Sequence, residues 1–181
     1  MSVRIPIFDL DGTLLDSDAA LLRPFVALGV RPEQVRFGAV VGEECERLGV
    51  DLDRYVALYD PGEAQPFPGV EDLLASLDRW ALCSNKHPRS GHAELARLGW
   101  RPTVALFTDA FDGPKRLEPV LAALGVAADE VVYVGDTAHD RAAARAAGVC
   151  FGLAAWNPRA EPVEGDVVLR RPAEVVALLA C

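Results

Sequence analysis

Short apolar runs alternate with longer amphipathic stretches along most of the chain. The β-rich runs occupy residues 4–10, 80–85, 104–112, 131–136, 149–156 and 166–169. Amphipathic stretches between them end at Gly99, Gly125 and Gly148, a typical helix C-cap. Near-continuous apolar runs such as VVYVG are typical of strands buried on both faces. This alternation predicts an α/β fold with a doubly wound parallel sheet.

Residues 16–66 depart from this pattern because they contain no convincing strand. Three stretches, residues 18–29, 32–49 and 51–60, have the apolar spacing of amphipathic helices. A Pro- and Gly-rich segment at 60–69 then indicates a hinge or linker. We therefore expect a core domain made of residues 1–15 and 67–181, with a small helical cap at 16–66.

Composition and charge restrict the class of protein. The 181 residues are 51% hydrophobic, enough for a sizeable core. The net charge of −9 argues against general nucleic-acid binding, because phosphate backbones select basic surfaces. We find no basic-then-apolar leader and no apolar run long enough to span a bilayer, so we expect a cytoplasmic protein without membrane contact.

Polar side chains follow four of the predicted strands. They are Asp9 and Asp11, then Ser84 and Asn85, then Lys115, and finally Asp136 and Asp140. Because ligands bind at the carboxyl ends of strands in open parallel sheets, we expect these groups to converge on one site.

Four converging carboxylates would repel one another unless a cation lay among them. Oxygen ligands without a His or Cys cluster suit Mg²⁺, which often shares its coordination with a substrate phosphate. Lys115, Ser84 and the backbone N–H groups near Gly12 could complete a phosphate-binding cradle. This set of groups indicates phosphoryl transfer.

The motifs FDLDGTLLDS, LCSNK, Lys115 and VGDTAHD, in this order, resemble those of the haloacid dehalogenase (HAD) superfamily of phosphohydrolases. PFPGVEDLLASL and RAAARAAGV resemble its phosphoglycolate-phosphatase-like branch, and the insert is similar to a short version of that branch's helical cap. The resemblance implies that Asp9 is the nucleophile that forms an aspartyl-phosphate. It implies that Asp11 first protonates the leaving oxygen and then activates water.

The resemblance also implies the binding roles. Ser84 and Lys115 would bind the phosphoryl group, with Asn85 and Gly12 in support. The metal site would comprise Asp9, Asp11 through its backbone carbonyl, Asp136, and Asp140 either directly or through water. Lys86 and His87 either face the substrate or lie in a solvated loop.

We therefore predict an Mg²⁺-dependent phosphatase that hydrolyses a small organic phosphomonoester, as a monomer or homodimer. One alternative is a sugar-phosphate mutase that transfers the phosphoryl group to a second acceptor. Another is a catalytically idle binding module, against which the complete set of motif residues argues. Dehalogenation is disfavoured, because a carbon–halogen displacement does not need the acid that Asp11 supplies.

Overall fold

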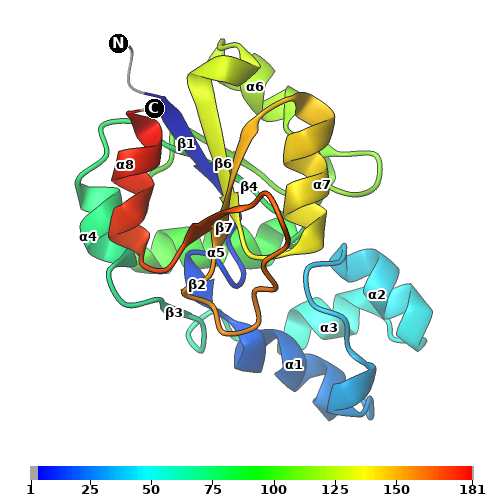
Figure 1. Cartoon of the computed structure of the whole chain (residues 1–181). Helices are drawn as coiled ribbons and strands as arrows, with labels where there is room; N and C mark the ends of the chain where they lie inside the picture. Colours follow the sequence, from blue (N-terminus) through cyan, green and yellow to red (C-terminus); the bar gives the residue numbers. More distant parts are fainter. Residues whose placement is uncertain (1–3, 181) are drawn as a thin grey trace.

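The computed structural model describes residues 4–180, and its centre is a six-stranded sheet (Figure 1). Residues 1–3 and 181, the ends of the predicted core domain, lie outside the described part. Every strand pair in the sheet is parallel, in the order β5-β4-β1-β6-β7-β8. The strands are β1 (Ile5–Phe8), β4 (Ala81–Cys83), β5 (Val104–Leu106), β6 (Val131–Gly135), β7 (Cys150–Ala154) and β8 (Val167–Leu169). The doubly wound sheet predicted from the apolar runs is confirmed.

Helices cover both faces of this sheet. One face packs against α4 (Val70–Ala75), α5 (Pro88–Leu98) and α8 (Val175–Leu179), and the other against α6 (Glu118–Leu124) and α7 (Ala138–Ala147). In β1, successive side chains alternate between the faces, so that Phe8 joins the first apolar cluster and Ile7 the second. Short 3₁₀ turns are η2 (Thr108–Ala110), η3 (Ala128–Glu130) and η4 (Pro172–Glu174).

A helical insert lies beside the carboxyl ends of the strands, at the lower right of Figure 1. It contains α1 (Asp18–Ala27), the 3₁₀ turn η1 (Pro32–Gln34), α2 (Val41–Leu48) and α3 (Leu52–Leu58). Two short antiparallel strands, β2 (Leu15–Asp16) and β3 (Gln65–Pro66), join it to the sheet. The sequence did not predict this strand pair. Within the described residues, no helix combines the length and the apolar character needed to cross a membrane.

The prediction of one helix over residues 32–49 was wrong in its middle. Residues 35–40 are not helical, because Gly38 has a φ of +83° and Val40 is extended. The carboxylate of Glu44 accepts the backbone N–H of Arg36 at 2.7 Å, which holds this irregular segment against α2. As a result, the segment reaches across to the polar ends of the strands.

Candidate active site

The tip of β1 places Asp9 at the centre of the site. Its backbone N–H donates to the carbonyl of Val134 at 2.9 Å, which continues the pairing with β6 for one more residue. The chain then turns at Gly12, whose φ is +78°. A Cβ at this position would lie 2.4 Å from Oδ2 of Asp136, so glycine is what allows the turn to approach the end of β6.

Lys115 lies between two carboxylates. Its Nζ is 2.9 Å from Oδ1 of Asp9 and 2.5 Å from Oδ1 of Asp140, and its side chain is 2% exposed. Its backbone N–H donates to Oδ1 of Asn85 at 2.7 Å, and Nδ2 of Asn85 donates to the carbonyl of Gly38 at 2.9 Å. Asn85 therefore fixes the loop that carries Lys115 and also joins the core to the insert.

Three carboxylates form one buried acidic cluster. Asp9, Asp136 and Asp140 each place an oxygen within 4.8 Å of the others. Burial raises the pKa of Asp9 to about 7 and that of Asp136 to about 8, and the neighbouring carboxylates add to both shifts. Protonation of these acids in the absence of a cation is the expected response to such crowding.

Asp140 differs from the other two acids because protein donors already surround it. Tyr133 donates its hydroxyl to Oδ1 at 2.7 Å, and Thr137 donates its backbone N–H at 2.9 Å and its hydroxyl at 2.6 Å to Oδ2. Although burial opposes it, the charge of Lys115 together with these hydrogen bonds holds the pKa of Asp140 below its usual value.

The cluster fits a divalent cation that prefers oxygen ligands. Oδ1 of Asp9 is buried and accepts no hydrogen bond of good geometry, although the ammonium of Lys115 is nearby. Asp136 is oriented by the hydroxyl of Thr13 at 3.1 Å and by Nδ2 of Asn157 at 2.8 Å. Preoriented carboxylate oxygens without nitrogen or sulfur donors are typical of Mg²⁺ sites.

Asp11, which is partly exposed, contacts a second buried group, which is centred on Lys86. Nζ of Lys86 lies 2.6 Å from Oδ1 of Asp11, 3.0 Å from Oε1 of Glu94 and 2.8 Å from the hydroxyl of Tyr59. Tyr59 in turn donates its hydroxyl to Glu94, whose pKa burial raises to about 7. Tyr59 directly follows α3, so this group also joins the insert to the core.

This arrangement excludes the solvated-loop interpretation of Lys86, because its side chain is 2% exposed. His87 is half-buried and caps α5 by accepting the N–H of Arg89. The sequence interpretation missed Glu94, Tyr59 and Asn157. One sequence signal was available for Lys86. The chain has only two lysines, Lys86 and Lys115, against sixteen arginines, and both lysines are buried at the site.

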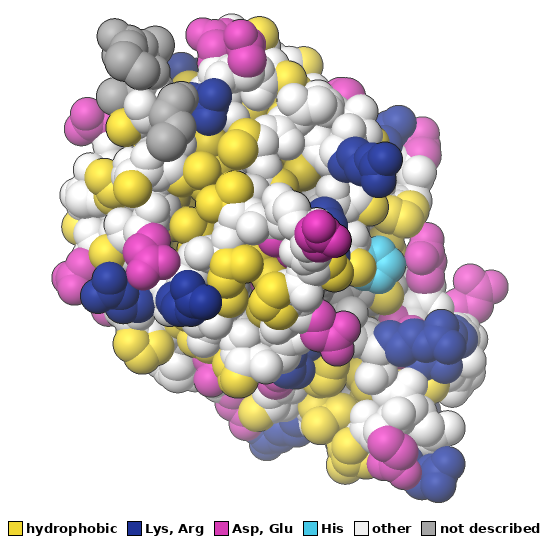
Figure 2. Space-filling view, in the orientation of Figure 1, with side chains coloured by type: hydrophobic (Ala, Val, Ile, Leu, Met, Phe, Trp, Pro, Cys, Tyr) yellow, Lys and Arg dark blue, Asp and Glu magenta, His cyan; other side chains and the backbone are white. Residues whose placement is uncertain are grey.

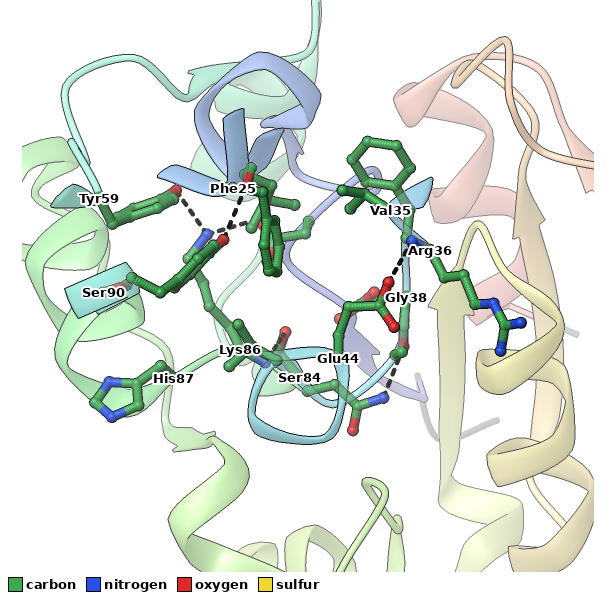
Figure 3. A pocket seen from close by; sticks show the side chains of 18 of the residues that line it. Phe25, Val35, Arg36, Gly38, Glu44, Tyr59, Ser84, Lys86, His87 and Ser90 are labelled. Atoms are coloured by element: carbon green, nitrogen blue, oxygen red, sulfur yellow. Dashed lines mark hydrogen bonds and ion pairs between the residues drawn. The ribbon is translucent and has the colours of Figure 1, made fainter. Parts of the chain in front are cut away.

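A cavity of about 50 Å³ lies between these groups and the insert (Figure 3). Its core side includes Asp9, Asp11, Ser84, Asn85, Lys86 and Lys115. Its insert side is largely apolar. The five residues that sequence analysis placed at the first three strand ends therefore line one cavity together with Lys86, and Asp136 and Asp140 lie next to Asp9.

The outer surface is less specialised than the cavity. Figure 2 shows basic, acidic and hydrophobic side chains interspersed over one face of the molecule, without a continuous basic area on that face.

Comparisons with known proteins cover nearly the whole chain. A family model described as haloacid dehalogenase-like hydrolase matches residues 28–148. The phosphoglycolate phosphatase of Xanthomonas campestris pv. campestris (strain 8004) is 34% identical, over 95% of this chain and 94% of the relative. The N-acetylmuramic acid 6-phosphate phosphatase of Pseudomonas aeruginosa is 27% identical, over 99% and 96%.

Two solved structures show the same fold. One is a HAD-superfamily hydrolase from Geobacter sulfurreducens, with a TM-score of 0.73, 24% identity and coverage of 98% of this chain and 100% of that chain. The other is the L-2-haloacid dehalogenase from Xanthobacter autotrophicus, with a TM-score of 0.72, 20% identity and coverage of 98% of both.

Proposed function

Because the chain belongs to the haloacid dehalogenase-like hydrolases, we propose that it hydrolyses small organic phosphomonoesters with Mg²⁺ bound. The resemblance indicated by the four sequence motifs is thereby confirmed. The relatives above are named for different phosphate esters, which supports the reaction class more than any one substrate. The placement of Asp9 is the strongest support, since this buried carboxylate faces the cavity, contacts Lys115 and adjoins two further acids.

In the proposed reaction, a carboxylate oxygen of Asp9 attacks phosphorus, and the ester oxygen leaves with the bonding electron pair. Asp11 gives its proton to that oxygen. Asp11, now a carboxylate, takes a proton from water, which attacks phosphorus, releases inorganic phosphate and restores Asp9. Ser84, Lys115 and backbone N–H groups near Gly12 hold the phosphoryl oxygens, so that positioning and charge neutralisation supply most of the catalysis.

Asp9, Asp136 and the backbone carbonyl of Asp11 would hold the cation. When bound, Mg²⁺ neutralises charge on the phosphoryl oxygens and between the carboxylates. Asp140 is engaged by Lys115, Thr137 and Tyr133, so we propose that it orients Lys115 and reaches the cation through water. Of the two alternatives that the sequence left open for Asp140, this proposal takes the indirect one.

We further propose that residues 16–66 act as a cap on a core made of residues 1–15 and 67–181. The contacts of Asn85 with Gly38 and of Lys86 with Tyr59 support this division, because both join the insert to the catalytic side of the core. A cap over the nucleophile excludes water and contacts the leaving group. A monomer or homodimer stays a prediction.

The test is a phosphate-release screen of the purified protein against a panel of phosphomonoesters, with Mg²⁺ and with excess chelator. We expect release only with Mg²⁺, and loss of turnover in a folded Asp9→Asn variant. Asp72→Asn, which changes an exposed acid on α4, is the matched control and should keep full activity. Full activity in chelator, or near-native rates for Asp9→Asn, would contradict the proposal. Transfer of phosphate to a second sugar phosphate without release would indicate a mutase.

A further inference from the structure

We infer, on the premise of the phosphatase activity proposed above, that the organic part of the substrate is small, uncharged and mainly apolar. The inference concerns the part of the cavity that lies between the phosphoryl-binding groups and the insert. It rests on the apolar lining there, on the pairing of the buried charged groups around the cavity, and on the cavity's size.

The insert supplies an apolar wall. The side chains on this wall are Leu21, Phe25, Val35, Phe37, Val41 and Tyr55. The one hydroxyl among them is already used, because Tyr55 donates to the carbonyl of Leu21 at 3.0 Å. Such a wall favours burial of hydrocarbon and offers a polar group no replacement for its lost water.

The buried cations of the cavity already contact protein carboxylates. Lys86 lies between Asp11 and Glu94, and Lys115 lies between Asp9 and Asp140. Each ammonium therefore already faces two acids at 2.5–3.0 Å. Lys86 also contacts the hydroxyl of Tyr59, and Lys115 is proposed above to hold the phosphoryl group. A substrate carboxylate would therefore have to displace one of these partners to reach either cation.

The acid of the insert is committed in the same way. Glu44 is 4% exposed and lines the cavity. It accepts the N–H of Arg36 at 2.7 Å and the Nε–H of Arg47 at 2.8 Å. The negative charge of Glu44 would repel a substrate carboxylate. Because both of its oxygens already accept hydrogen bonds from arginines, Glu44 is also not free to bind a cationic group of a substrate.

Two further basic residues border the cavity without offering a charge to it. The side chain of Arg36 is exposed and extends away from the other labelled side chains (Figure 3). Burial lowers the pKa of His87, so its imidazole is neutral near pH 7, and one ring nitrogen accepts the N–H of Arg89. Among the described residues of the lining, no unpaired cation therefore points into the cavity in this structure, and a carboxylate held there would be buried without a partner.

The volume of the cavity favours a small organic part. A cavity needs roughly 10–15 Å³ for each water molecule it holds. The present volume of about 50 Å³ leaves room for a phosphoryl group and a few carbon atoms. A short alkyl phosphate is therefore the chemical class that fits this cavity best.

A pair of isosteric substrates tests the inference directly. Isobutyl phosphate and 2-phosphoglycolate both have a primary alkoxide leaving group, and they differ by an isopropyl group in place of a carboxylate. We expect kcat/KM to be at least about tenfold higher for isobutyl phosphate, because one methyl-sized apolar contact or one unpaired charge is each worth this much. A smaller ratio, or a preference for 2-phosphoglycolate, would overturn the inference.

A binding measurement keeps this test separate from the test of the proposed function. Two phosphonates that cannot be hydrolysed, 3-methylbutylphosphonate and 3-phosphonopropionate, mimic the two esters. Isothermal titration calorimetry with Mg²⁺ should give at least about tenfold tighter binding for the uncharged one. If no ester releases phosphate, the proposed function fails, whereas the ratio of dissociation constants still supports or overturns the inference.

A variant should reverse the preference. Val35→Lys places an ammonium on the apolar wall, and we expect the ratio of kcat/KM values to shift toward 2-phosphoglycolate by at least about tenfold. Val26→Lys is the matched control, because Val26 is 46% exposed on α1 and lies outside the cavity lining. Equal shifts in both variants would show a general charge effect and would overturn the assignment of this wall. Circular dichroism checks the fold, and the wild-type measurements decide if Val35→Lys does not fold.

Discussion

Replacing Lys86 with Met should destabilise the protein strongly, although the side-chain length is kept. The substitution removes the ammonium that Asp11 and Glu94 share, and it leaves the hydroxyl of Tyr59 with one fewer partner. Glu94 is fully buried and half of its carboxylate already lacks a hydrogen-bond partner, so it depends on this cation more than the partly exposed Asp11 does.

Removing one partner of a buried ion pair costs about 3–5 kcal/mol. Protonation of Glu94 limits that cost, because its pKa is raised to about 7 even with Lys86 present. A group with a raised folded-state pKa loses its stabilising contribution as the pH rises toward that value. We therefore expect a loss of about 3 kcal/mol in the free energy of unfolding at pH 6, and a larger loss at pH 8.

Urea denaturation at both pH values, followed by circular dichroism, measures this loss. The double variant Lys86→Met/Glu94→Gln removes both charges together, and we expect it to be at least about 1 kcal/mol more stable than the sum of the single losses predicts. Arg89→Met is the matched control, since Arg89 is exposed on α5, the helix that carries Glu94. Surface substitutions usually change the free energy of unfolding by no more than about 0.5 kcal/mol.

A loss below about 1 kcal/mol for Lys86→Met, without coupling to Glu94, would refute this reasoning. It would mean that water reaches these carboxylates in solution, and that burial does not set the energy of the contacts around Lys86.

Three other outcomes are expected. Without metal, thermal stability should fall between pH 6 and 8.5, because Asp9 and Asp136 have raised pKa values of about 7 and about 8 and stabilise the fold only while they stay protonated. Mg²⁺ should reverse this fall, and a flat metal-free profile in differential scanning calorimetry would contradict the prediction. Asp11→Asn should slow hydrolysis of alkyl phosphates by roughly 10²–10⁴-fold, and with aryl phosphates it should accumulate a phosphoenzyme that mass spectrometry of the intact protein detects. Normal turnover of alkyl phosphates would exclude Asp11 as the acid. Asn85→Ala removes the hydrogen bonds to Gly38 and to the N–H of Lys115, so we expect faster proteolysis of residues 35–40 together with a lower kcat. If both values are unchanged, Asn85 does not hold the insert and the Lys115 loop in place.

The strands could be predicted because each is encoded by a local apolar run, and the strand order of an α/β sheet then brings the strand ends together. Asp9, Lys115 and Asp136 could be proposed for the same reason, since each follows a strand. By contrast, β2 and β3 are two residues long and exist only through pairing between Leu15 and Pro66, which no local pattern shows.

The second buried group was beyond the sequence for a similar reason. Lys86 meets Glu94 and Tyr59 only because α5 packs beside the end of α3, and these residues are separated by up to 35 positions. The segment at residues 35–40 is not helical because Gly38 has a positive φ. The apolar spacing around Gly38 is compatible with a helix, so the sequence pattern did not indicate this conformation.

Because both lysines lie at the site, a reagent that acylates amines can report how often the insert moves away from the core. Because Lys86 and Lys115 are 4% exposed and every other basic side chain in the chain besides histidine is arginine, an acylating reagent finds no lysine on the surface. Each acylation of a lysine therefore records an excursion in which the insert has moved far enough to admit the reagent. Labelling rates followed by peptide mass spectrometry would time that motion without any engineered tag, and a bound ligand that closes the insert should slow them.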